Sequence, residues 1–107
     1  MNNETNQMNT PYYAVIFTSI KNEQSIGYQE MAQQMWVLAQ EQPGFLGVES
    51  ARNELGITVS YWKDLPSIAK WKQNSDHMLA QQFGRDKWYS HYKVRICLVE
   101  REYEFTS

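Results

Sequence analysis

The fold is decided by one stretch of the chain, residues 43–62, which reads PGFLGVESARNELGITVSYW. Two strand-like runs, residues 45–52 and 56–62, are separated by the short segment Asn53-Glu54-Leu55. Gly56 is able to supply a backbone position with positive φ beside this turn. The pattern predicts an antiparallel β-hairpin.

The residues before the hairpin predict a strand and a helix. Residues 12–18 (YYAVIFT) are almost all β-branched or aromatic, which is typical of a central strand covered on both faces. Between residues 28 and 39, apolar side chains recur at helical spacing, with Gln and Glu on the opposite arc. We expect Pro43-Gly44 to end this amphipathic helix.

The residues after the hairpin predict a second helix and a last strand. Asp64 as N-cap and Pro66 in the first turn favour a helix start. We expect this helix to break at Asn74 and to start again at Ser75-Asp76. Residues 94–105 alternate in polarity at first and then become charged, which predicts one long final strand.

The predicted element order is β, α, β, β, α, β, which indicates an α+β fold of the ferredoxin-like, split βαβ kind. Both helices would pack on one face of an antiparallel sheet, and a second copy of the sheet is the simplest cover for the other face. We therefore expect a homodimer. Residues 1–11 are polar and predict a disordered tail without chemistry, so the domain spans residues 12–107.

The charge and composition exclude several classes of protein. Ten basic and twelve acidic residues give a net charge of −2, which offers no electrostatic footprint for nucleic acid or an anionic membrane. The longest apolar stretch is far shorter than a bilayer span, and the N-terminus has no signal-peptide pattern. The single cysteine, Cys97, rules out an internal disulfide and is expected to be buried and inert. We expect a cytoplasmic protein.

Further motifs stand out along the chain: residues 43–50, residues 57–62, Trp71-Lys72, His77, and residues 84–89 with Tyr92. Together these motifs resemble the antibiotic biosynthesis monooxygenase (ABM) family, over about residues 12 to 105. The resemblance implies a ferredoxin-like protomer that pairs through its sheet into a dimeric α+β barrel, with a pocket between helices and sheet. It also implies an oxidoreductase, since related proteins include cofactor-independent monooxygenases that convert phenolic compounds to quinones.

A haem-degrading branch of the same superfamily is a weaker match. Its resemblance implies an Asn on the first strand, a Trp on the helical segment and a histidine that ligates iron. Trp71 fits the Trp position, but residues 12–18 contain no Asn, and Gln81-Gln82 stand where the histidine is expected. We therefore expect no cofactor, with haem disfavoured. The sequence also lacks the usual spacing of metal ligands.

A cofactor-free oxygenase needs an apolar site with few polar groups, because its task is to stabilise a deprotonated aromatic that then reacts with oxygen. We single out His77 as a candidate base, since a helix start favours neutral imidazole, and Arg85 as a candidate partner for an anionic oxygen. His91, near the predicted helix end, is a weaker candidate. Candidate substrate-binding residues are Trp71, Trp88, Tyr92, Glu49, Ser60 and Phe83.

Each candidate also has a structural interpretation. Aromatic residues at helical spacing are often core, an exposed histidine is often only polar surface, and Arg85 is equally able to pair with a neighbouring acid. We expect Trp36 and Trp62 to be packing residues. Three functions stay open: a monooxygenase acting on a small aromatic or quinol, a non-enzymatic binder of a small aromatic ligand, and a haem-binding or haem-degrading protein.

Overall fold

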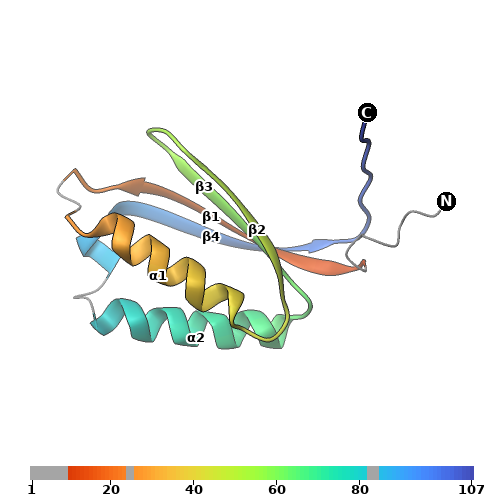
Figure 1. Cartoon of the computed structure of the whole chain (residues 1–107), viewed down its shortest axis with the longest axis horizontal. Helices are drawn as coiled ribbons and strands as arrows, with labels where there is room; N and C mark the ends of the chain where they lie inside the picture. Colours follow the sequence, from red (N-terminus) through yellow and green to blue (C-terminus); the bar gives the residue numbers. More distant parts are fainter. Residues whose placement is uncertain (1–9, 24–25, 82–84) are drawn as a thin grey trace.

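A computed structural model describes residues 10–23, 26–81 and 85–107 of the chain. The predicted α+β order is confirmed, with a short 3-10 helix added before the last strand (Figure 1). The elements are β1 (Tyr12–Lys21), α1 (Tyr28–Gln40), β2 (Phe45–Arg52), β3 (Gly56–Trp62), α2 (Leu65–Gln81), η2 (Arg85–Lys87) and β4 (Tyr89–Val99). The tail predicted over residues 1–11 lies almost wholly outside the described residues.

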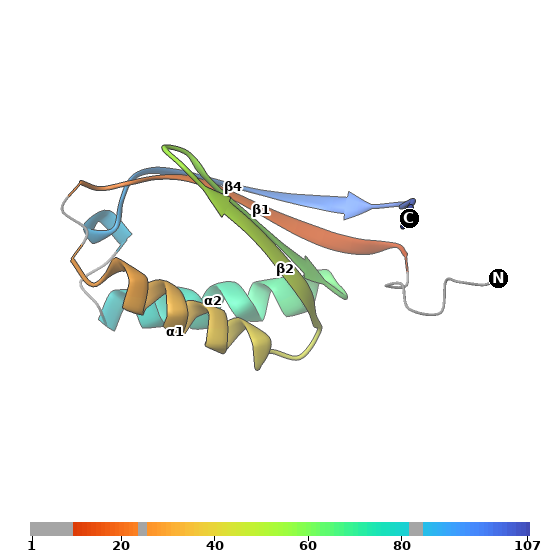
Figure 2. The same cartoon turned by 45° about the horizontal axis from the view of Figure 1, so that its top comes forward.

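The four strands form one antiparallel sheet in the order β2-β3-β1-β4, so β1 is a central strand as predicted. Both helices lie on the same side of this sheet (Figure 2). Because side chains alternate along a strand, each strand presents one row to the helices and one row to the opposite, open face.

The predicted hairpin is confirmed with the expected bounds for β2 and β3. The prediction about Gly56 is wrong, because positive φ is found at Gly27 and Gly44 among the described glycines. Gly56 is instead a strand residue in register with Arg52, and the turn is closed earlier by a hydrogen bond from the Asn53 N–H to the Leu55 carbonyl (3.1 Å).

The helix α2 begins as predicted. The Asp64 carboxylate accepts hydrogen bonds from the Ser67 N–H (2.9 Å) and the Ser67 hydroxyl (2.6 Å). These two bonds lower the pKa of Asp64, because they favour its charged form. The side chain therefore caps the first turn of α2.

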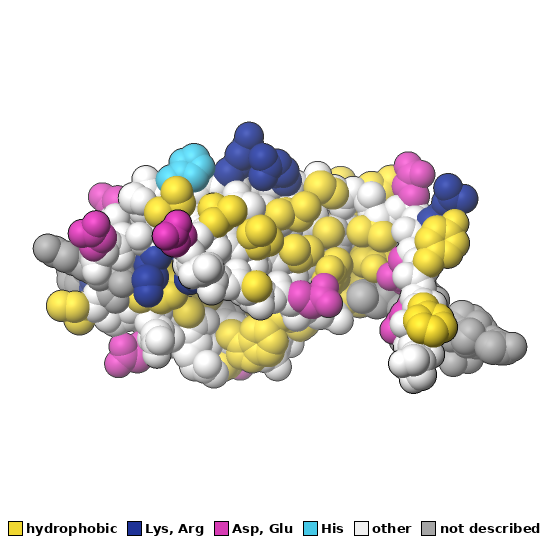
Figure 3. Space-filling model, turned by 90° about the horizontal axis from the view of Figure 1, so that it is seen from above, with side chains coloured by type: hydrophobic (Ala, Val, Ile, Leu, Met, Phe, Trp, Pro, Cys, Tyr) yellow, Lys and Arg dark blue, Asp and Glu magenta, His cyan; other side chains and the backbone are white. Residues whose placement is uncertain are grey.

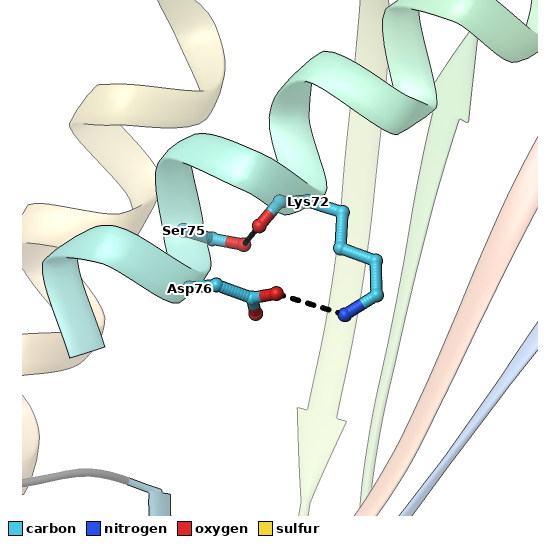
Figure 4. Close-up of polar contacts among 3 residues, drawn as sticks. All are labelled: Lys72, Ser75 and Asp76. Atoms are coloured by element: carbon cyan, nitrogen blue, oxygen red, sulfur yellow. Dashed lines mark hydrogen bonds and ion pairs between the residues drawn. The ribbon is translucent and has the colours of Figure 1, made fainter. Parts of the chain in front are cut away.

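The predicted break at Asn74 is wrong, since α2 is continuous from Leu65 to Gln81. The polar residues around this point find partners without leaving the helix. The Ser75 hydroxyl donates to the Lys72 carbonyl (3.1 Å), and Lys72 forms an ion pair with Asp76 one turn later (2.9 Å; Figure 4). Asn74 donates to the side chain of Gln42 (2.9 Å), which ties α2 to the end of α1.

The long final strand is also a wrong prediction, because β4 ends at Val99 and residues 100–107 have no regular secondary structure. Val99 is in register with Tyr12, the first residue of β1. Beyond that point no described residue pairs with the chain, and a strand alone cannot satisfy its backbone hydrogen bonds. Alternating polarity could not reveal where the partner strand stops.

Two buried clusters form the core between the helices and the sheet. The packing role predicted for Trp62 is confirmed, since its side chain is fully buried. The same prediction for Trp36 is wrong, because its side chain is 46% exposed on α1. Cys97 is partly rather than fully buried. The clusters consist of Val15, Trp62 and Ile68, and of Met31, Leu79 and Trp88.

The open face of the sheet carries a band of apolar side chains, with Lys, Arg and His side chains along one edge (Figure 3). Ile57 on β3 and Ile20 on β1 are 41% and 43% exposed on this face. No helix in the described part of the chain is long and apolar enough to span a membrane.

Candidate functional site

A row of half-exposed apolar side chains on β4 faces the helical side of the sheet. Tyr92, Val94, Ile96 and Leu98 are 39%, 47%, 52% and 48% exposed. Their partners on β1 include Phe17 and Val15, which point to the same side. The row stays open because α1 packs against β2 and α2 against β3, while β4 is the edge strand on the far side of β1. We call Phe17 and these four β4 residues the β4 ledge.

Aromatic rings mark both ends of the β4 ledge. At one end, Tyr92 stacks on Phe17 with ring centroids 5.5 Å apart, and Tyr89 meets Phe17 edge-on at 5.3 Å. At the other end, Trp71 from α2 stacks on the buried Trp62 at 5.8 Å. Flat apolar surfaces of this kind favour stacking with planar aromatic molecules.

The β4 ledge ends at a row of side chains that crosses the whole sheet. Arg52, Gly56, Ser19 and Tyr92 lie side by side in register on β2, β3, β1 and β4. The Arg52 guanidinium donates from Nη1 to the Ser19 carbonyl (3.4 Å) and from Nη2 to the Ser19 hydroxyl. Gly56 permits this reach, since a Cβ there would overlap the guanidinium.

Three of the predicted binding residues lie on the helical side of the sheet. Tyr92 belongs to the β4 ledge. Trp71 stacks on Trp62 near the opposite end of the ledge. Ser60 is in register with Val15 and Ile96, and its hydroxyl accepts a hydrogen bond from Trp62 Nε1 (2.8 Å). These three residues share one side of the sheet, which the sequence could not show, and their role in binding stays a prediction.

Two other predicted binding residues lie elsewhere. Trp88 is only 1% exposed and belongs to the core cluster of Met31 and Leu79, with no partner for its Nε1 among the described residues. Glu49 points to the open face, where it accepts a hydrogen bond from Tyr61 (2.6 Å). Neither contacts the β4 ledge. Phe83 lies outside the described residues.

The two predicted catalytic residues have different positions. Arg85 is the first residue of η2, directly before the segment that leads into β4. His77 is exposed on α2 and lines a shallow hollow between α1 and α2, where its Nε2 is 3.3 Å from Gln81 Nε2.

The prediction that each of the two histidines lies near a helix end is wrong. His77 lies in the interior of α2, so it is not at a helix start, and His91 lies in β4 rather than near a helix end. The dipole arguments for both residues therefore do not apply, because a macrodipole acts only within the terminal turns.

The open face holds two tyrosine–glutamate pairs. Tyr12 donates to Glu102 (2.6 Å) and Tyr61 donates to Glu49 (2.6 Å), while the two rings meet edge-on at 5.9 Å. Burial and the bond to Glu102 raise the pKa of Tyr12 to about 12. The bond to Glu49 and burial raise the pKa of Tyr61 to about 12. Both phenols stay protonated at neutral pH and act as hydrogen-bond donors.

Sequence reasoning missed Arg52, Ser19, Lys21 and Tyr28, which gather at the Tyr92 end of the β4 ledge. Arg52 and Ser19 are 33 positions apart, and no motif connects them. Their contact depends on strand order and register. Within the described residues, no group of three or more His, Cys, Asp or Glu side chains is arranged to hold a metal ion.

The chain is similar to several known proteins. The family model for antibiotic biosynthesis monooxygenase matches residues 11–82. The Bacillus subtilis (strain 168) protein YqjZ is 50% identical over 94 residues, which cover 86% of this chain and 82% of that protein. A 43-residue segment is 33% identical to the jasmonate monooxygenase ABM of Pyricularia oryzae, covering 40% of this chain and 20% of that enzyme.

Solved structures show the same fold. A variant of SnoaB, a cofactor-independent oxygenase from Streptomyces nogalater, superposes with a TM-score of 0.71 at 8% identity, over 87% of this chain and 97% of SnoaB. Identity this low bears on the fold alone. The family match spans more than half of the chain and includes α1, the β2–β3 hairpin and α2. This chain therefore belongs to the antibiotic biosynthesis monooxygenase family.

Proposed function

We propose that this protein is a cytoplasmic, cofactor-independent monooxygenase that oxidises a small phenolic or quinol-like aromatic to a quinone. The observation that carries the proposal is the β4 ledge, an open apolar surface with aromatic rings at both ends. Family membership supports the reaction class, as does the similarity to SnoaB, a cofactor-independent oxygenase, and to the jasmonate monooxygenase of Pyricularia oryzae.

The reaction balances without an added reductant. A hydroxyarene with a free ring position and one O₂ give a quinone and one water, so one oxygen atom enters the product and the other leaves as water. A quinol already carries both oxygen atoms, so with one O₂ it gives a quinone and one hydrogen peroxide. The protein's contribution would be to hold the ring, to favour its deprotonated form and to limit access of water. In this arrangement the ring lies against Phe17 and Tyr92.

The test is oxygen uptake by the purified protein with anthrones, quinols and hydroxynaphthalenes, with quinone products identified by mass spectrometry. Turnover above the uncatalysed background is expected. We expect Tyr92→Ala to lower kcat/KM about tenfold, since it removes one stacking contact. Trp36→Ala is the matched control, because Trp36 is similarly exposed but lies on α1. Equal losses in both variants would contradict a role for the β4 ledge.

The same assay tests the two residues that the sequence suggested for catalysis. Arg85 is proposed to stabilise the anionic oxygen, and Arg85→Gln should then lower kcat more than it raises KM. His77→Ala tests the proposed base, and an unchanged rate and pH profile would remove His77 from the mechanism.

The alternative is a non-enzymatic domain that binds a small aromatic molecule. It is favoured by the position of His77, which is exposed on the helical layer and not on the β4 ledge. Saturable binding of a hydroxynaphthalene without oxygen uptake would support this alternative. A Soret band on adding haemin, lost in His77→Ala, would instead indicate haem binding.

We further propose that the open face pairs with a second copy of this chain. Charges at its two edges support an isologous, two-fold arrangement. Glu49, Val59, Ile16 and Arg95 lie in register across the four strands, with the acid on β2 and the base on β4. A two-fold axis along the strands would place Arg95 opposite Glu49 of the partner subunit, with the apolar residues packed between.

A further inference from the structure

Two positive side chains meet one aromatic ring at the end of the β4 ledge. The Lys21 Nζ lies 4.9 Å from the centroid of the Tyr28 ring, and the Arg52 Cζ lies 5.7 Å from the same centroid. Both residues are exposed, so an ion in solution can reach them. Two cations beside one neutral ring repel each other, and they create a local excess of positive charge.

That positive charge has no acidic partner in the described part of the chain, where the one ion pair joins Lys72 to Asp76. Glu30, the acidic residue in the first turn of α1, lies toward Gly27 rather than in an ion pair with either cation.

The Arg52 side chain is held in place and still has N–H donors available for a ligand. It donates two hydrogen bonds to Ser19, which is fully buried, and the guanidinium lies across Gly56. A guanidinium carries five N–H groups, so donors remain for an acceptor in solution. A fixed guanidinium binds a carboxylate with less loss of side-chain entropy than a free one.

This cluster is continuous with the β4 ledge. Tyr28 meets Tyr89 edge-on at 5.8 Å, and Tyr89 meets Phe17 at 5.3 Å. Ser19, which anchors Arg52, is in register with Tyr92. A planar ring stacked on Phe17 and Tyr92 would therefore have the two cations at its edge.

We propose that Arg52 and Lys21 form an anion-binding subsite beside Tyr28, which receives the carboxylate of an aromatic acid whose ring lies on the β4 ledge. The inference rests on the proposed function, which places the aromatic ring on the β4 ledge. It narrows the class of ligand from aromatic molecules in general to anionic ones. Gly56 is part of the subsite, because its missing side chain leaves room for the guanidinium.

The test compares a redox-inert aromatic acid with its neutral amide, 2-naphthoate against 2-naphthamide. Dissociation constants are measured by isothermal titration at 25 mM and 250 mM NaCl. We expect the wild type to bind 2-naphthoate about tenfold more tightly at low salt, as for a charge-assisted hydrogen bond. The preference should shrink at high salt because Lys21 and Arg52 are exposed.

Three variants locate the effect. Arg52→Gln and Lys21→Gln each remove one charge and should reduce the preference for 2-naphthoate over 2-naphthamide. Gly56→Ala keeps both charges but displaces the guanidinium from Ser19. Lys70→Gln is the matched control, since Lys70 is an exposed lysine on α2. Circular dichroism checks that each variant is folded. If Arg52→Gln does not fold, Lys21→Gln still tests the subsite.

Equal affinity for the acid and the amide would overturn the subsite, as would a preference that survives in both charge-removing variants. Failure of both compounds to bind would overturn it as well. Because 2-naphthoate is not a substrate for oxidation, binding with the expected preference but without any oxygenase activity would leave the subsite standing and refute the proposed function alone.

Discussion

The two faces of the sheet both expose apolar side chains, but different polar groups border them. On the helical side, the β4 ledge ends at two cations, Lys21 and Arg52, that form no ion pair with a described acidic residue. On the open side, the acid Glu49 and the base Arg95 stand at opposite edges of the same row.

This difference fits the two kinds of partner that we propose. A narrow apolar surface with a local excess of one charge suits a small molecule of the opposite charge. A broad apolar surface with both charges at opposite edges suits a second copy of itself, because two-fold symmetry brings unlike charges together.

The largest effect is expected in the core on the helical side. Trp62 is fully buried, so Trp62→Ala should lower the free energy of unfolding by about 3–5 kcal/mol. Ile57→Ala, on the open face, should cost far less in the isolated chain because Ile57 is 41% exposed. Urea denaturation at low protein concentration measures both. Similar losses would mean that the open face is as well packed as the core.

A matched pair of lysine substitutions separates the two faces. Ile57 and Ile96 are 41% and 52% exposed, on the open and helical sides respectively. We expect Ile57→Lys to convert a dimer into a monomer, since it places a charge in the proposed interface. Ile96→Lys should leave the dimer intact and reduce binding of a neutral hydroxynaphthalene about tenfold.

Analytical ultracentrifugation and ligand titration give both readouts for this pair. A wild-type chain that sediments as a monomer at all concentrations would refute the proposed interface. The opposite pattern, in which Ile96→Lys splits the dimer, would exchange the roles of the two faces.

The tyrosines of the open face predict a loss of stability in alkali. The pKa of Tyr12 is raised from 10.0 to about 12, so its neutral form is favoured by folding. Its contribution to stability is fully present below pH 10 and is lost as the pH rises through 12, and we expect it to be about 1–2 kcal/mol. The unfolding free energy of Tyr12→Phe should therefore fall less between pH 10 and 12 than that of the wild type. Parallel curves would contradict the Tyr12–Glu102 bond.

The smallest effect on stability is expected at the start of α2, in the helical layer that leaves the β4 ledge open. Asp64 caps α2, and its pKa is lowered by two hydrogen bonds from Ser67. Its contribution is present above the ordinary aspartate pKa of 3.8 and is lost as the pH falls through the lowered value. Asp64→Ala should reduce Tm slightly at pH 7 and leave it unchanged in strong acid. Glu104→Ala, an exposed control outside the helices, should change neither.

Local sequence signals predicted most of the secondary structure. The bounds of β2, β3 and the start of α1 follow from apolar periodicity, and the start of α2 follows from the capping chemistry of Asp64. The wrong predictions share a cause. The break at Asn74 and the extension of β4 beyond Val99 were judged locally, but a cross-helix bond from Asn74 and the end of the neighbouring strand decide them.

The site was predicted less well, for a similar reason. Trp71, Ser60 and Tyr92 were proposed from residue type, whereas Arg52 and Ser19 carry no local signal. Glu49 and Ser60 are both hairpin residues with a polar side chain, yet they point to opposite faces. Residue chemistry suggests a candidate, but the face on which it lies depends on register.

The amino-acid pattern alone predicted the order of the strands and helices along the chain and the hairpin, because period, capping and turn chemistry act over a few residues. The family was suggested separately, by the resemblance of a few motifs. Only the tertiary structure decided that β4 is an edge strand with an uncovered helical side, and that Arg52 reaches Ser19 across Gly56. Alternation along a strand creates two faces but does not say which one the helices cover. That choice is made by contacts between residues far apart in the sequence, where packing and strand order act together.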